Sequence, residues 1–226
     1  MPKCPFATWT LISGPSGAYT SGPFKIVHHT TEGSSASGAM ASFRAHKSDP
    51  HFTVDGTTIY QHVDTDQAAR ALRNQPEGVQ TNRDRAIQIE VVGFAGKLKP
   101  KATLKQVARL CRWLEAAHGI PRVWPSGPPK PAVAGGDPGG HNRSAANWTT
   151  KGGHYGHCHV PENIHWDPAY TAMEAEFMLA AEFSASGTIT NSIEPKVKAL
   201  LDRPAAMGMA AFSPQVMADH GDVGER

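Results

Sequence analysis

Short apolar runs rich in β-branched residues mark the strands expected in this chain. Residues 24–28 form one such run, which ends at the first of two consecutive histidines. Residues 86–93 form another, with isoleucines and valines on both sides of a single glutamate. The runs 51–54 and 57–63 flank the dipeptide Asp55-Gly56, which favours a tight two-residue turn, so they predict a β-hairpin.

Apolar residues spaced three or four positions apart predict a helix over residues 103–118. Thr103, with Gln106 three positions later, matches a capping box at its start, and Gly119 and Pro121 end it. Further helices are predicted over residues 39–47, 66–73 and 171–183. Helices that alternate with strands, together with a hairpin, predict an α/β fold with a central mixed β-sheet flanked by helices.

Two segments carry no clear periodicity. Residues 125–153 are rich in proline and glycine, and a long irregular stretch inside a domain is often functional. The pattern also weakens in the C-terminal part, and the end of the chain is predicted to be disordered. We therefore expect one α/β domain over residues 1–183 and a partly helical extension over 184–226. The site is expected at one end of the sheet, where His28 and Glu90 stand at strand ends.

Composition and charge narrow the classes of partner. The net charge of +2 is too small to argue for nucleic-acid binding. No apolar run is long enough for a transmembrane helix, so stable membrane insertion is not expected. The N-terminus lacks the basic start and continuous apolar stretch of a secretory signal. Three scattered cysteines do not predict a disulfide framework, which favours synthesis in a reducing cytoplasm.

The densest group of chemically active side chains lies between residues 154 and 168. It combines histidines with two carboxylates directly after the glycine-rich stretch: His154, His157, His159, Glu162, His165 and Asp167. Imidazole and carboxylate groups are zinc ligands, and catalytic zinc usually takes three protein ligands and a water molecule. A single histidine is more often structural, and a histidine-rich surface loop is the alternative reading. The grouping nevertheless favours a zinc site.

Four segments, in this order, resemble the zinc-dependent N-acetylmuramoyl-L-alanine amidases, which share a fold with peptidoglycan recognition proteins. The segment 25–31 looks like the first strand of that family, and 51–61 looks like its hairpin. The segment 82–93 is similar to its central strand, and 156–168 to the stretch that carries its last two zinc ligands. Each segment alone is a weak signal, but the ordered combination is specific.

The resemblance implies a set of zinc ligands. His28 matches the first ligand and His157 the second, while Asp167, standing before Pro168, matches the third. His165 falls where relatives carry a lysine or histidine that stabilises the transition state. An alternative assignment remains open, in which His165 binds the metal and Asp167 supports it through a hydrogen bond.

Glu90 matches the glutamate that acts as general base in part of the family. Its apolar strand neighbours favour a raised pKa, which suits that role, although an exposed face of a half-buried strand is the alternative. Relatives often carry a tyrosine where this chain has Pro50, which favours Glu90 as the base. His29, His51 and His62 are expected to line the substrate groove.

The function implied by the resemblance is zinc-dependent hydrolysis of the amide bond between N-acetylmuramic acid and L-alanine in peptidoglycan. The expected partner is peptidoglycan or a muropeptide, bound by a monomer. The alternatives are a non-catalytic peptidoglycan-binding protein of the same fold and a zinc peptidase that cuts within the stem peptide. A phage endolysin made in the cytoplasm and released to the wall, by a holin or otherwise, fits the resemblance, as does a cytoplasmic enzyme that recycles wall fragments.

Overall fold

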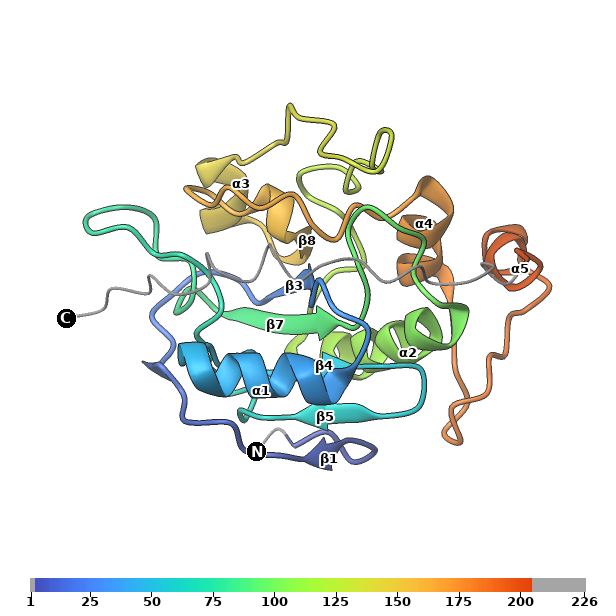
Figure 1. Ribbon diagram of the computed structural model, residues 1–226, viewed down its shortest axis with the longest axis horizontal. Helices are drawn as coiled ribbons and strands as arrows, with labels where there is room; N and C mark the ends of the chain where they lie inside the picture. The colour runs from blue at the N-terminus through green and yellow to red at the C-terminus, as the bar shows by residue number, and fades with distance from the viewer. Residues whose placement is uncertain (1–2, 205–226) are drawn as a thin grey trace.

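The computed structural model describes residues 3–204, and its centre is a six-stranded mixed sheet in the order β1-β5-β4-β7-β3-β8 (Figure 1). β3 runs parallel to β7 on one side and to β8 on the other, and β4 runs parallel to β7. β4 and β5 form the expected hairpin. The strands of this sheet are Thr8–Trp9 (β1), Lys25–Thr30 (β3), Phe52–Val54 (β4), Ile59–Gln61 (β5), Ala86–Val91 (β7) and Gly153–Gly156 (β8).

Helices cover both faces of the sheet. Figure 1 shows α1 in front of it, whereas α2 packs against the other face through Leu104, Val107 and Leu114, which share the main core with Ile26 and Ile89. The helices are Ala36–His46 (α1), Lys101–His118 (α2), Ala145–Thr150 (α3), Ala172–Ala180 (α4) and Pro195–Leu201 (α5), with a short 3-10 helix at His157–His159 (η1). The expected single α/β domain with a central mixed sheet is therefore confirmed.

Alternation along the central strands decides which side chains meet. Successive residues of a strand point to opposite faces. On β3, Ile26 joins the core beneath α2, whereas Val27 belongs to a separate cluster with Trp148 and Tyr155 on the other face. All six residues of β3 are buried. The two histidines that follow Val27 are consequently divided between the two faces.

Three local predictions were wrong. Residues 66–73 form no helix. A short strand β6 (Gln67–Ala68) pairs there with β2 (Gly17–Ala18), and Arg70 exchanges backbone hydrogen bonds with Asp49. These partners are distant in sequence, so they override local helix propensity.

The start of α2 differs from the predicted capping box. Its N-cap is Pro100, which offers no side-chain cap, and Thr103 is buried inside the first turn. Gln106 instead donates to the carbonyl of Thr57. The irregular stretch 125–153 also contains α3, which Ser144 caps by accepting from the backbone N–H of Asn147.

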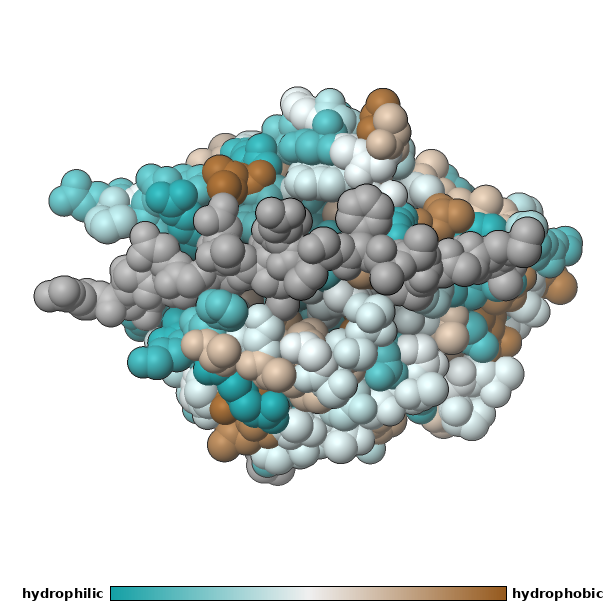
Figure 2. Space-filling model, viewed as in Figure 1, coloured by the Kyte–Doolittle hydropathy of each residue, from teal (hydrophilic) through white to brown (hydrophobic). Residues whose placement is uncertain are grey.

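The C-terminal segment packs on the domain as far as it is described. Val197 and Leu200 of α5 are fully buried and belong to the main core. The predicted disorder at the end of the chain falls outside the described residues. On the face drawn in Figure 2, hydrophobic residues are scattered among polar ones wherever described residues are visible. Within residues 3–204, no helix has both the length and the apolar character to cross a membrane.

Candidate metal centre

His29, His157 and Asp167 meet at the end of β3 where the strand leaves the sheet. The Nδ1 atoms of His29 and His157 are 3.1 Å apart. Asp167 places Oδ1 3.2 Å from Nδ1 of His157 and Oδ2 4.0 Å from Nδ1 of His29. One donor atom from each residue lies within 4.8 Å of the others, and all three residues are buried.

The chain is folded locally so that His157 and Asp167 can meet. Gly156 precedes His157, and a Cβ atom there would lie 2.8 Å from Cδ of Pro168 and 2.9 Å from Sγ of Cys158. Only glycine allows this close approach. The backbone N–H of Cys158 then donates to the carbonyl of Asp167, at 3.0 Å. The bond ties the start of η1 to the segment that carries the carboxylate.

His157 and Asp167 are each held from behind. Nε2 of His157 lies 3.0 Å from Oδ1 of Asn163. Oδ2 of Asp167 accepts the backbone N–H of Thr30 at 2.9 Å. These contacts leave the opposite atoms, Nδ1 of His157 and Oδ1 of Asp167, directed into the cluster. Such supporting contacts are typical of protein metal ligands.

Glu90 stands beside the cluster because it is paired in register with His29 across β3 and β7. Its Oε1 lies 3.9 Å from Nδ1 of His29, and the residue is only 3% exposed. Burial, reinforced by the nearby carboxylates of Asp167 and Glu32, raises the pKa of Glu90 well above its usual value. A carboxyl group with a raised pKa can take up a proton near neutral pH, as a general base must.

The pKa of Asp167, unlike that of Glu90, is lowered. Burial by itself favours the protonated acid, but His157 adjoins and hydrogen-bonds the carboxylate, and His29 and His165 add positive potential. Together they hold the pKa of Asp167 well below its usual range. The ring of His165 stacks on that of His157, with centroids 4.7 Å apart. His165 therefore lies beside the cluster.

The donor set fits a zinc ion. Two imidazole nitrogens and one carboxylate oxygen are a known ligand set for catalytic zinc, which keeps its fourth position open. The anionic Asp167 would offset part of the metal charge, and the carboxyl group of Glu90 lies beside the three donors.

A second histidine cluster lies on the other face of the sheet. Nε2 of His28 is 3.0 Å from Nδ1 of His154, and Sγ of Cys111 on α2 lies within 4.8 Å of one ring nitrogen of each histidine. Nδ1 of His28 is 3.2 Å from the hydroxyl of Tyr170, and Nε2 of His154 is 3.0 Å from Oε1 of Glu115. The result is a continuous buried hydrogen-bonded chain from Tyr170 to Glu115.

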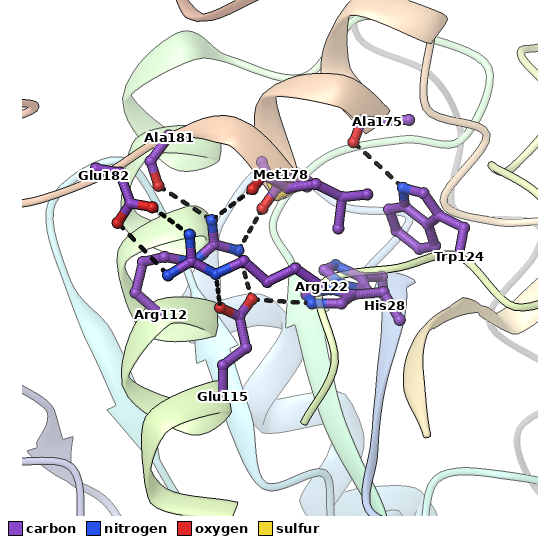
Figure 3. A network of polar contacts seen from close by, with 11 residues as sticks. His28, Arg112, Glu115, Arg122, Trp124, Ala175, Met178, Ala181 and Glu182 are labelled. Atoms are coloured by element: carbon purple, nitrogen blue, oxygen red, sulfur yellow. Dashed lines mark hydrogen bonds and ion pairs between the residues drawn. The ribbon is translucent and has the colours of Figure 1, made fainter. Parts of the chain in front are cut away.

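Glu115 is the anchor of this chain. In Figure 3, dashed lines join its carboxylate to the guanidinium groups of Arg112 and Arg122, with which it forms ion pairs. Arg122 also pairs with Glu182, and Arg112 donates to the carbonyls of Met178, Leu179 and Ala181 at the end of α4. The network thus joins α2, β3, β8 and α4.

This second cluster suits a zinc ion less well. The grouping supplies three donors, whereas buried structural zinc almost always takes four. Its polar atoms already satisfy one another if Tyr170 donates to His28, His28 to His154, and His154 to Glu115. Burial lowers the pKa of His28 and raises that of Cys111. Neutral, hydrogen-bonded side chains are therefore the stable state here.

The expected ligand set needs one replacement, because His28 does not lie with His157 and Asp167. His28 and His29 are neighbours on one strand and point to opposite faces. His29, expected to contact substrate, is the histidine that joins the cluster, so we exchange the two assignments. Asn163 and Glu32 were not anticipated. Asparagine is not a usual zinc-ligand type, and Glu32, although a carboxylate, stands in a loop without a spacing that signals a metal site.

His51 and His62 lie in buried hydrogen bonds rather than on an open surface. His51 contacts the hydroxyl of Tyr19, the carbonyl of Gln67 and the backbone N–H of Gln88. His62 is 1% exposed and contacts Thr53 and the carbonyl of Thr10. These contacts give both histidines a structural role, so we do not retain them as substrate-binding residues.

Comparisons with known proteins find similar solved structures and one matching family. Among solved structures, a selenomethionine derivative of AmpD has a TM-score of 0.49 at 15% identity, covering 78% of this chain and 96% of its own. The hydrolase AmiA of Staphylococcus aureus has a TM-score of 0.45 at 19% identity, covering 72% and 71%. The endolysin LysCS of Clostridium intestinale, an N-acetylmuramoyl-L-alanine amidase, has a TM-score of 0.40 at 19% identity, covering 53% and 80%.

No curated protein sequence matches the chain. A family model described as N-acetylmuramoyl-L-alanine amidase matches residues 21–170, which is more than half of the chain and includes every member of the cluster around His29. The resemblance expected from the sequence is thereby confirmed. The protein belongs to the N-acetylmuramoyl-L-alanine amidase family and is a hydrolase of the peptidoglycan amidase class.

Proposed function

We propose that the protein is a zinc-dependent amidase that hydrolyses the bond between the lactyl group of N-acetylmuramic acid and L-alanine. The proposed ligands are His29, His157 and Asp167. The observation that carries the proposal is the convergence of these three donors beside the buried carboxyl of Glu90. A metal site with an adjacent general base is the arrangement that metal-assisted amide hydrolysis requires.

When bound, zinc lowers the pKa of a coordinated water molecule and polarises the amide carbonyl. The protein's own groups supply the proton transfers. Glu90, with its raised pKa, takes the proton from the attacking water and later delivers it to the departing amine of L-alanine. His165, stacked on His157, donates a hydrogen bond to the oxygen that becomes negatively charged in the transition state.

The setting that we propose is the bacterial cell wall. The substrate is peptidoglycan or a muropeptide released from it, and one chain carries a complete set of ligands and a base, so a monomer suffices. Lysis of the wall by an enzyme made in the cytoplasm and released later is the role that we favour. Recycling of wall fragments inside the cell is the second candidate.

The proposal is tested by digestion of purified peptidoglycan with and without a chelator, followed by mass analysis of the soluble products. We expect chelator-sensitive release of intact stem peptides that carry a free amine on L-alanine. Products cut inside the stem peptide would identify a peptidase. An undigested wall that still retains the protein would identify a binding protein. Comparing intact walls with soluble muropeptides then separates lysis from recycling.

A further inference from the structure

We propose that Asn163 is a positioning residue that fixes the tautomer of His157 and couples this ligand to the segment around Arg73. The inference rests on the proposed zinc site, because its consequence for affinity needs a metal at His157. Asn163 lies in the loop between η1 and Asp167 and is 4% exposed. Its side chain contacts protein groups on every side.

The orientation of the Asn163 amide follows from the backbone around it. Its nitrogen Nδ2 lies 3.0 Å from the carbonyl oxygen of Arg73 and 2.9 Å from that of Pro161. Its oxygen Oδ1 accepts the backbone N–H of Arg73 at 3.0 Å. Carbonyl oxygens only accept and an N–H only donates. A flipped amide would oppose like groups at all three contacts, so Oδ1 must face His157.

This orientation fixes which ring nitrogen of His157 keeps its hydrogen. Because Oδ1 of Asn163 can only accept, Nε2 of His157, 3.0 Å away, must carry the hydrogen. Nδ1 is the other nitrogen, the one that faces His29 and Asp167, and in a neutral imidazole it is the bare one. Asn163 thus leaves Nδ1, rather than Nε2, to give its lone pair to a metal ion.

The same amide connects the site to a distant part of the chain. Arg73 belongs to the segment between β6 and β7, and both its backbone N–H and its carbonyl bind Asn163. Asn82 makes the same pair of hydrogen bonds to the neighbouring residue, Leu72: Oδ1 accepts its backbone N–H, and Nδ2 donates to its carbonyl. The two asparagines therefore support one segment, but only Asn163 reaches a ligand. Asn82 is consequently a matched control.

The test compares Asn163→Ala and Asn82→Ala with the wild-type protein. Ring nitrogen NMR shifts of His157 in the metal-free protein report its tautomer, and competition with a chelator reports zinc affinity. We expect wild type and Asn82→Ala to keep the hydrogen on Nε2. For Asn163→Ala we expect a mixture of tautomers and a loss of zinc affinity of about 10–100-fold, the usual effect of removing such a support.

Two results with these variants would overturn the inference: an unchanged tautomer and affinity in Asn163→Ala, or an equal loss in both variants, which would indicate general destabilisation. If Asn163→Ala does not fold, the wild-type protein still tests the inference, because a neutral His157 ring that carries its hydrogen on Nδ1 would contradict it. A wild-type protein that binds no zinc would contradict the proposed function. The tautomer measurement in metal-free protein would still decide the role of Asn163.

Discussion

His28 and His29 are adjacent on β3, yet each heads a different cluster on a different face of the sheet. Both clusters are buried, and in both a pair of ring nitrogens lies 3.0 to 3.1 Å apart. The third donor differs: on one face it is the carboxylate of Asp167, and on the other it is the thiol of Cys111. The surroundings differ as well.

Around His29, the carboxyl groups of Asp167, Glu90 and Glu32 gather, and no lysine or arginine among residues 3–204 forms an ion pair with Asp167 or Glu90. Around His28, the single carboxylate of Glu115 is already paired with two arginines. Carboxyl groups without a cationic partner favour the binding of a metal ion, whereas a neutralised network does not. Neighbouring charges, more than the histidines themselves, therefore make the cluster around His29 the better candidate for a metal site.

The largest effect should be the difference between substitutions of the two histidines. We expect His29→Gln to lose both bound zinc and measurable amidase activity, because one of the three proposed ligands is gone. His28→Gln should keep its zinc and lose stability, about 1–3 kcal/mol for each buried group left unsatisfied. Zinc content by mass spectrometry and urea unfolding measure the two effects. Zinc loss confined to His28→Gln would restore the assignment expected from the sequence.

Removing the general base should separate binding from chemistry. We expect Glu90→Gln to keep zinc while kcat falls about 10²–10⁴-fold, the usual contribution of a positioned acid or base. The amide is close in size to the carboxyl, so packing beside His29 is preserved. Zinc content and kcat are measured on the same sample. Near-full activity in this variant would remove Glu90 from the mechanism.

Replacing Glu115, the carboxylate that holds the second cluster in place, should affect folding alone. Glu115→Ala leaves Arg112, which is nearly buried, without its carboxylate partner, and breaking such a pair costs about 3–5 kcal/mol of unfolding free energy. We expect kcat per folded molecule to stay unchanged. Urea unfolding and activity at a temperature well below the transition test both parts. A large fall in kcat would mean that the two faces are coupled.

A smaller catalytic effect is expected at His165. Replacing it with alanine removes the proposed donor to the transition-state oxygen, and the loss in kcat should be about 10²-fold with zinc retained. Zinc content also tests the alternative ligand assignment, because a variant without zinc would make His165 a ligand. Asp167→Asn is the companion variant, and we expect it to lose zinc.

The smallest effect near neutral pH concerns a purely structural histidine. Burial lowers the pKa of His51 to about 3, and Nδ1 accepts the N–H of Gln88, so protonation would break that bond. Below the ordinary histidine pKa of about 6.5, the unfolded chain takes up a proton that the folded chain refuses. Stability should then fall by about 1.4 kcal/mol per pH unit down to about pH 3.

Unfolding of the metal-free protein at several pH values checks this slope. His51→Gln should flatten it, and His46→Gln, at the half-buried C-terminal end of α1, serves as the control. An identical slope in wild type and His51→Gln would show that other groups cause the acid sensitivity.

The sequence was sufficient for the strands and helices with strong local patterns, including β3, β7, α2 and α4. It was insufficient for choosing between His28 and His29. A strand buried on both faces shows no alternation of apolar and polar residues, so its pattern does not reveal which side chains share a face. The answer depends on what packs above and below, which is tertiary information.

The other differences have similar causes. The segment 66–73 has helix-forming residues, but its backbone is paired with Asp49 and held by Asn82. α3 spans only six residues, too few for a periodic signal, although Ser144 is a recognisable N-cap. Asn163 was missed because a single asparagine in a loop has no distinctive spacing. Its importance comes from contacts with Arg73 and His157, which lie far from each other in sequence.

The C-terminal segment has a consequence for protein engineering. Arg203 donates to the carbonyl of Lys99 and to the carboxylate of Glu174, and Lys101 donates to the carbonyls of Leu201 and Arg203. These bonds clamp the segment onto the starts of α2 and α4. Anyone who grafts this catalytic unit onto a new wall-targeting module should therefore place the joint beyond Arg203. A junction after residue 183 would remove the core helix α5 and leave buried charged side chains exposed.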